Sequence, residues 1–165
     1  MMLSRLIPLG TAAALSAFFV LSPLAAQEAA SGAAALSPAE ALKTRAEAMK
    51  ALGGANRALA PLAAGQTVPA AALQTAAKTM SEEGDKLAAL FPAGSSIADL
   101  PESYALPTIW SDPEGFSAAL EKFRKAAHGL EEAAGGGDQA AINAAFAELR
   151  PTCGACHQTY RQPKN

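Results

Sequence analysis

The chain has 165 residues, of which 50% are hydrophobic and only 5% aromatic, and its formal net charge is −2 at pH 7. It lacks the basic clusters and interleaved aromatic and basic residues of nucleic-acid-binding proteins, so we expect no nucleic-acid partner. Alanine is abundant and β-branched residues are sparse, a composition that favours helices. We therefore expect an all-α protein.

The first 26 residues have the features of a secretory signal peptide. One basic residue, Arg5, precedes an apolar run that ends near Val20, and small residues lead to a cleavage point after Ala26. Because a membrane span needs ~20 apolar residues, the run is short for an uncleaved anchor. Export predicts a periplasmic protein, with a flexible leader at residues 27–36 and one domain at residues 37–165.

The first helix is expected at residues 38–61, where the start signals are strong. Ser37 is a favourable N-cap, the proline after it suits the first helical position, and Glu40 completes a capping box. Heptad spacing places Arg45 and Met49 one turn apart on a face that points inward. A buried arginine needs an anion unless its charged end reaches water, and the residues alone leave both outcomes open.

A second helix is expected from Pro69 to Phe91, after a turn at residues 64–68. Residues 92–112 then form a long irregular connection with three prolines. A connection of this length in a small helical domain either packs on the helices or is mobile. Its apolar side chains, including the only tryptophan, Trp110, favour packing.

Two aspartates mark the starts of the last two helices. Asp112 caps the third helix, which ends at the glycines of residues 135–137, and Asp138 caps the fourth. His128 lies one step off the apolar stripe of the third helix, so we expect an edge residue rather than a metal ligand. In the fourth helix, Pro151 costs ~3 kcal/mol unless the helix kinks or restarts, and we expect a bend at that point.

The fourth helix ends with the pattern Cys-Gly-Ala-Cys-His at residues 153–157, close to the C-terminus. Two thiols three residues apart can reach the two vinyl groups on one edge of a porphyrin, and the histidine that follows can place a ring nitrogen beneath the iron. Neutral imidazole is a strong axial ligand for haem iron. The pattern predicts one covalent haem c attached to Cys153 and Cys156, with His157 as an iron ligand.

Three other kinds of site fit these residues less well. A zinc site normally has four ligands, and Cys153, Cys156 and His157 supply only three. A dithiol redox pair belongs at a helix start inside a βαβ unit, and no such unit precedes this pair. A disulfide across two intervening residues would be strained and would close almost no loop. A haem-free dithiol oxidoreductase is therefore the weakest functional alternative.

With four expected amphipathic helices, a signal peptide and a C-terminal Cys-x-x-Cys-His pattern, the chain resembles the class II c-type cytochromes, the cytochrome c prime family. Class I cytochromes c carry the pattern near the N-terminus instead. The resemblance covers most of the mature chain and implies an antiparallel four-helix bundle with haem near the C-terminal end of the fourth helix. The matching residues are Arg45, Met49, Lys50, Leu90-Phe91-Pro92, Pro107-Thr108-Ile109-Trp110, the motif at 153–157, Tyr160 and Arg161.

The resemblance also implies roles for single residues. Cys153 and Cys156 would form the thioether bonds to haem, and His157 would be the proximal ligand. Arg45 would lie near a haem propionate, and Arg161 matches a basic residue that the family keeps near the proximal side.

Met49 matches the distal position, where the family divides. In one branch a methionine ligates the iron and gives a low-spin electron carrier, whereas in the other an apolar residue leaves high-spin iron that binds NO or CO. The likeness of residues 49–53 and 90–92 to the low-spin branch favours an electron carrier with Met49 as sixth ligand, with periplasmic redox proteins as partners and no substrate turnover. NO or CO binding is the alternative. Relatives often pair through their first two helices, so a homodimer is a further expectation.

Overall fold

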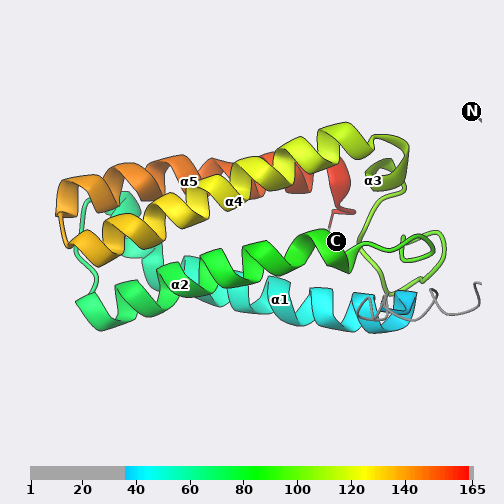
Figure 1. Ribbon diagram of the computed structural model, residues 1–165, viewed down its shortest axis with the longest axis horizontal. Coiled ribbons are helices and arrows are strands. Elements are labelled where there is room, and N and C mark those ends of the chain that lie inside the picture. The colour runs from blue at the N-terminus through cyan, green and yellow to red at the C-terminus, as the bar shows by residue number, and fades with distance from the viewer. Residues whose placement is uncertain (1–35, 164–165) are drawn as a thin grey trace, which may run out of the picture. The chain divides into compact units, whose positions relative to one another are not determined.

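The computed structural model describes residues 36–163, and its regular elements in that range are all helical, as the composition predicts. The long helices run alternately up and down one axis, so the expected antiparallel four-helix bundle is confirmed (Figure 1). The expected signal peptide, and the leader up to residue 35, lie outside the described residues. The long helices are α1 (Pro38–Leu59), α2 (Ala70–Lys86), α4 (Pro113–Gly136) and α5 (Gln139–Tyr160). The short ones are the 3-10 helices η1 (Ala60–Ala64) and η2 (Leu87–Leu90), and α3 (Thr108–Ser111).

Three of the four edges of the bundle are closely packed. Helix α1 packs on α2, α2 packs on α4, and α4 packs on α5. Within the described residues, α1 and α5 have no comparable contact, although η1, which follows α1, does pack on α5. The bundle is therefore open along much of the edge between its first and last long helices.

The helix starts follow the capping signals of the sequence. Ser37 and Glu40 form the expected capping box of α1, in which the backbone N–H of Ser37 donates to the Glu40 carboxylate at 3.0 Å. At the start of α4, the N–H of Gly115 donates to Asp112 at 3.1 Å, and Asp138 accepts in the same way at the start of α5. Each side chain satisfies a backbone donor that the first helical turn leaves unpaired.

The second helix ends earlier than the sequence predicts. We expected helix as far as Phe91, but α-helical geometry stops at Lys86 and the chain continues as η2 to Leu90. In a 3-10 turn, side chains three residues apart lie on the same side. The tighter turn thus directs both Leu87 and Leu90 into the core, where they are 4% and 3% exposed.

Helix α5 continues through Pro151, so it does not restart there. Proline has no N–H, and the carbonyl of Ala147 therefore lacks its helical partner. Both residues are exposed, which allows water to bond that carbonyl. On the buried side, the Thr152 hydroxyl donates to the carbonyl of Leu149 at 2.6 Å. A bend at Pro151 stays a prediction.

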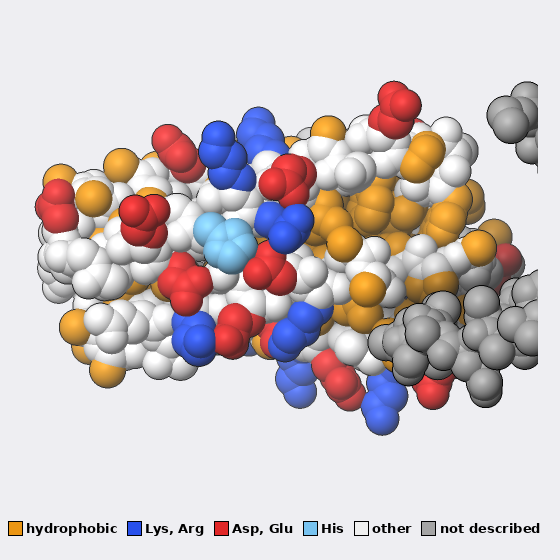
Figure 2. Space-filling model, in the orientation of Figure 1, with side chains coloured by type: hydrophobic (Ala, Val, Ile, Leu, Met, Phe, Trp, Pro, Cys, Tyr) orange, Lys and Arg blue, Asp and Glu red, His pale blue; other side chains and the backbone are white. Residues whose placement is uncertain are grey.

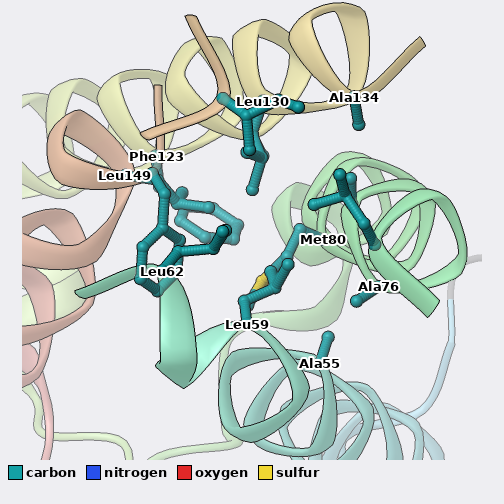
Figure 3. Packing of buried hydrophobic residues seen from close by; sticks show 14 of the residues in the cluster. Ala55, Leu59, Leu62, Ala76, Met80, Phe123, Leu130, Ala134 and Leu149 are labelled. Carbon is teal, nitrogen blue, oxygen red and sulfur yellow. The ribbon is translucent and has the colours of Figure 1, made fainter. Parts of the chain in front are cut away.

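The centre of the bundle is a core to which every long helix contributes. Leu59, Met80, Leu130 and Leu149 come from α1, α2, α4 and α5 in turn, are at most 1% exposed, and meet inside the bundle (Figure 3). Burying each such side chain stabilises the fold by about 1.5–3 kcal/mol. Met80 fills the centre of this core. Among the described residues, no helix combines the length and apolarity needed to cross a membrane.

The connection between η2 and α4 packs on the bundle, as its apolar residues predict. The indole N–H of Trp110 donates to the carbonyl of Phe91 at 3.2 Å, which fastens the end of the connection to its start. Ala105 and Ile109 form a second apolar cluster with Tyr160 from the end of α5. The connection is therefore held at both ends, next to the Cys-x-x-Cys-His motif.

Candidate functional site

A cavity of about 700 Å³ lies around the C-terminal end of α5 and faces α1. Its walls come from α1, α4, α5, the end of α2 and the connection before α4, and they are mostly apolar. This volume lies within the range of sites that enclose a cofactor. The larger apolar side chains of the lining include Leu42, Leu52, Leu87, Phe91, Ile109, Phe116 and Leu120.

The motif places three reactive side chains on one wall of this cavity. Cys153, Cys156 and His157 all line it and are half-buried, and the two cysteines are not joined by a disulfide. Helical spacing explains the arrangement, because residues three and four apart lie on one face of α5. Within residues 36–163, no three His, Cys, Asp or Glu side chains converge in a way that would hold a metal ion.

Burial sets the protonation of these groups. Burial raises the pKa of the Cys153 and Cys156 thiols. It lowers the pKa of the His157 imidazole, and the positive charge of Arg161 lowers that pKa further by a smaller amount. A dithiol oxidoreductase needs a thiolate, so raised thiol pKa values oppose that alternative. A neutral imidazole is the form that binds iron.

Met49 lies on the opposite helix and lines the same cavity. It is half-buried on α1 and packs against the hydrophobic core. The inward direction that heptad spacing predicts for Met49 is therefore confirmed, and the structure brings it to the cavity that His157 lines from α5. Met80 also reaches this cavity, but it is only 1% exposed.

Arg45, one turn before Met49, is buried with 6% of its surface exposed. Its Nη1 donates to the Leu90 carbonyl at 2.9 Å and to Ser95 Oγ at 3.2 Å, and its Nη2 donates to the Ser95 carbonyl and to Ser103 Oγ, both at 3.0 Å. The inward direction predicted for Arg45 is confirmed. Its partners in the chain are neutral oxygens, however, and the sequence offered no signal for Ser95 or Ser103.

The segment after the motif is fastened to the connection. The Leu106 N–H donates to the Tyr160 carbonyl at 3.0 Å, and the Gln162 N–H donates to the Tyr104 carbonyl at 2.8 Å. Arg161, between these bonds, lines the cavity and places Nη1 3.4 Å from His157 Nδ1. These contacts fix the chain at the C-terminal end of α5, directly after the motif.

His128 belongs to a polar cluster between α2 and α4, outside the cavity. Its Nδ1 lies 3.0 Å from Ser81 Oγ and its Nε2 lies 3.1 Å from Asp85 Oδ1, to which Arg124 Nε also donates at 3.0 Å. Figure 2 shows a histidine over these two helices among acidic and basic side chains. Hydrogen bonds from His128 and Arg124 hold the pKa of Asp85 below its usual value. The histidine is exposed, as expected for an edge residue.

The lining of the cavity fits a covalently attached haem. One wall carries two free thiols and an imidazole, and the remaining surface is chiefly apolar. The charged lining residues are the cations Arg45, Lys50, Arg57 and Arg161 and the single carboxylate Glu102. An excess of cations suits a ligand with carboxylate groups of its own.

The family model for cytochrome c' matches residues 40–161, a range that includes every residue lining the cavity. The chain belongs to the cytochrome c' family. Members of this family bind covalent haem c, so the predicted family and cofactor are both confirmed.

Individual relatives match shorter stretches of sequence. Cytochrome c-554 from Cereibacter sphaeroides is 39% identical over 69 residues, which cover 42% of this chain and 44% of that protein. Cytochrome c' from Rubrivivax gelatinosus is 41% identical over 58 residues, or 35% of this chain and 45% of that protein. The chain thus spans about half the length of the curated relatives it matches.

Solved structures of the family match nearly the whole bundle. Cytochrome c' from Rhodobacter spheriodes superimposes with a TM-score of 0.68 at 27% identity, covering 78% of this chain and 100% of that one. A nitric oxide complex of a variant of cytochrome c prime from Alcaligenes xylosoxidans gives a TM-score of 0.67 at 26% identity, covering 77% and 98%.

Proposed function

We propose that this cytochrome c' family member is a periplasmic electron carrier in which His157 and Met49 ligate the iron of one haem c. The observation that carries the proposal is the position of Met49, on the α1 wall of the cavity that His157 lines from α5. When bound, the haem supplies a one-electron Fe(III)/Fe(II) couple. The protein supplies the covalent attachment, two axial donors and an enclosure that is chiefly apolar.

Met49 is the side chain of α1 best suited to a sixth ligand. Its thioether is a soft donor, which suits ferrous haem, and a His/Met ligand pair raises the reduction potential. Arg45 is charged, and its terminal nitrogens are already bonded to the end of η2 and to the connection that follows it. Lys50 is exposed, and Met80 is 1% exposed within the core of the four helices.

The remaining residues would attach and orient the haem. The thiols of Cys153 and Cys156 would add to its vinyl groups, which fixes the haem to α5. Arg161 would stay on the proximal side, next to His157. Redox proteins of the periplasm would exchange electrons with the haem, and a homodimer through α1 and α2 remains part of the proposal.

Binding of NO or CO is the second candidate, and family membership favours it. Solved relatives include nitric oxide complexes of cytochrome c prime from Alcaligenes xylosoxidans. In that case Met49 would pack over the haem as a flexible apolar side chain without bonding to the iron. A diatomic ligand would then bind in the apolar space beside it.

The optical spectrum of the haem-loaded protein, with its spin state at neutral pH, separates the two candidates. Met49→Ala keeps the attachment residues and removes the thioether, so we expect it to convert a low-spin spectrum to high spin. Met49→Leu keeps the apolar volume and should convert the spectrum in the same way. Met80→Leu serves as the matched control and should leave the spectrum unchanged, because Met80 is part of the core.

A wild-type spectrum that is already high spin would reject Met49 as a ligand and favour binding of NO or CO. A low-spin spectrum that survives both Met49 substitutions would reject the proposal as well, since another group would then be the sixth ligand. Protein matured with a haem supply that shows no haem absorption would reject both candidates.

A further inference from the structure

Tyr160, the last residue of α5, lies between the haem attachment site and the start of α4. Its hydroxyl donates to Asp112 Oδ2 at 2.7 Å, and the residue is only 7% exposed. Cys156 packs against the apolar cluster that contains Tyr160, and a spacing of four residues places the two on one face of α5. Tyr160 also lines the haem cavity. Its phenol is therefore close to a residue that attaches the haem.

The surroundings of Tyr160 are apolar around the ring and polar at the hydroxyl. The ring packs edge-on against Phe116, with 5.3 Å between the ring centres, and Ala105 and Ile109 complete the buried cluster. Asp112 caps α4 and is exposed, so the residue that accepts from the phenol is in contact with water. The hydrogen bond to Asp112, with a smaller contribution from burial, raises the pKa of the Tyr160 phenol. The phenol therefore keeps its proton at neutral pH.

Oxidation of a phenol in this position requires that a proton leaves together with the electron. A phenol that loses only an electron becomes a cation, and a charge in an apolar site is costly. A phenol that donates to a carboxylate can pass its proton along that bond, which leaves a neutral radical. Asp112 lies within the hydrogen-bond reach required of a general base. Tyr160 and Asp112 are therefore arranged for the coupled loss of an electron and a proton.

Tyr160 also separates the haem cavity from a second groove. This groove has a volume of about 300 Å³ and lies between α4 and α5, where its lining includes the exposed residues Lys122, Ala155 and Thr159. Tyr160 and Thr152 line both the groove and the haem cavity. An unpaired electron on Tyr160 would thus lie in the wall between the haem and the outer surface.

We propose that Tyr160 gives one electron to the haem when hydrogen peroxide has oxidised the haem beyond its ferric state, and that Asp112 accepts the phenolic proton. Peroxide withdraws two electrons from the ferric haem as its O–O bond breaks. Tyr160 returns one of these electrons, its O–H bond breaks, and the proton moves to the Asp112 carboxylate. The products are a neutral tyrosyl radical and a carboxylic acid. Because Asp112 is exposed, water then takes up its proton.

The test mixes hydrogen peroxide with the ferric, haem-loaded Met49→Leu protein and records the electron paramagnetic resonance spectrum after rapid freezing. Met49→Leu removes the proposed sixth ligand, so peroxide reaches the iron whether or not Met49 ligates it in the wild type. The role of Tyr160 therefore requires bound haem, which family membership establishes, but not ligation by Met49. The spin state tests the proposed function, and the radical tests Tyr160. We expect the spectrum of a tyrosyl radical.

Three substitutions in this protein assign the radical. The chain has two tyrosines, Tyr104 and Tyr160, and both line the haem cavity. Tyr104→Phe leaves Tyr160 as the only tyrosine and should retain the signal, whereas Tyr160→Phe should lose it. Asp112→Asn keeps a capping side chain and an acceptor oxygen but removes the base, so it should lose most of the signal. Thermal unfolding of each variant before mixing excludes unfolding as the reason for a lost signal.

Absence of a tyrosyl signal from the Met49→Leu protein would overturn the proposal. A tyrosyl signal that survives in Tyr160→Phe, or one that disappears in Tyr104→Phe, would overturn it as well, since Tyr104 would then be the donor. An equal radical yield in Asp112→Asn would show that the contact with Asp112 is only structural. If Tyr160→Phe does not fold, the Tyr104→Phe protein decides alone, because its tyrosyl signal can come only from Tyr160.

Discussion

Substitution of two glycines in the same helix should change stability in opposite directions. A Cβ on Gly115, in the first turn of α4, would lie 2.6 Å from the Tyr160 hydroxyl and would also collide with the Asp112 carboxylate. A Cβ on Gly129, in the same helix, would meet nothing within 4 Å. Gly115→Ala should therefore destabilise the protein, whereas Gly129→Ala should stabilise it by about 1 kcal/mol through helix propensity.

The size of the Gly115 effect follows from the bonds that the new methyl group would displace. Tyr160 donates to Asp112 at 2.7 Å, and loss of a hydrogen bond to a charged group costs about 1.5–3 kcal/mol. Loss of the Asp112 cap destabilises the protein by about 1 kcal/mol more, and the higher helix propensity of alanine relative to glycine offsets a similar amount. The net loss is about 1.5–3 kcal/mol, or a fall in Tm of about 6–12 °C for a domain of this size.

Thermal unfolding of the haem-loaded variants, followed by far-UV circular dichroism, measures both effects. Tyr160→Phe removes the same hydrogen bond without the collision and should lose a similar amount, about 1.5–3 kcal/mol. The double variant Gly115→Ala/Tyr160→Phe should lose less than the sum of the two single losses, because the residues share one contact. Gly115→Ala as stable as wild type would refute the reasoning, since the end of α5 would then not be held by this contact.

Two further predictions concern the pair of helices α2 and α4. Gly84→Ala would place a Cβ 2.8 Å from the Phe123 ring, so it should destabilise the protein by about 1–3 kcal/mol. Thermal unfolding measures this loss, and an unchanged Tm would show that α2 does not approach α4 this closely. Asp85→Asn should reduce the loss of stability in acid. Bonds from His128 and Arg124 depress the pKa of Asp85 in the folded protein, so its contribution is present above the unfolded-state pKa and is lost as the pH falls through the folded-state value. Urea unfolding from pH 6 down to about pH 3 should show the two proteins converging, and parallel curves would contradict this sign.

The helix limits could be predicted from the sequence because they depend on local chemistry. Ser37 with Glu40, and Asp112 with its following proline, satisfy backbone donors within one turn, and the structure shows these caps in place. The end of α2 was harder to predict, because the change to 3-10 geometry at Leu87 depends on core packing rather than on a breaking residue.

The residues of the motif in the candidate site could be predicted from the sequence, but the hydrogen-bond partners that hold Arg45 could not. The spacing of Cys153, Cys156 and His157 places all three on one helical face, and membership of the cytochrome c' family confirms haem c. The partners of Arg45 follow from long-range folding, since Ser95 and Ser103 lie 50 and 58 residues further along the chain. No periodicity links residues so far apart, so the sequence placed Arg45 on the inward face of its helix without predicting what would hold it.

Because the edge between α1 and α5 is open, exchange of the proposed Met49 ligand should depend on the distance between these two helices. The attachment residues and His157 are all on α5, whereas Met49 is on α1, and these two helices are held together chiefly through their neighbours. A small displacement of α1 would therefore change the distance from Met49 to the opposite wall and leave the motif undisturbed. If Met49 ligates the iron as proposed, mutations in the α1–α2 contact should then alter how readily an added ligand such as imidazole or CO displaces its thioether.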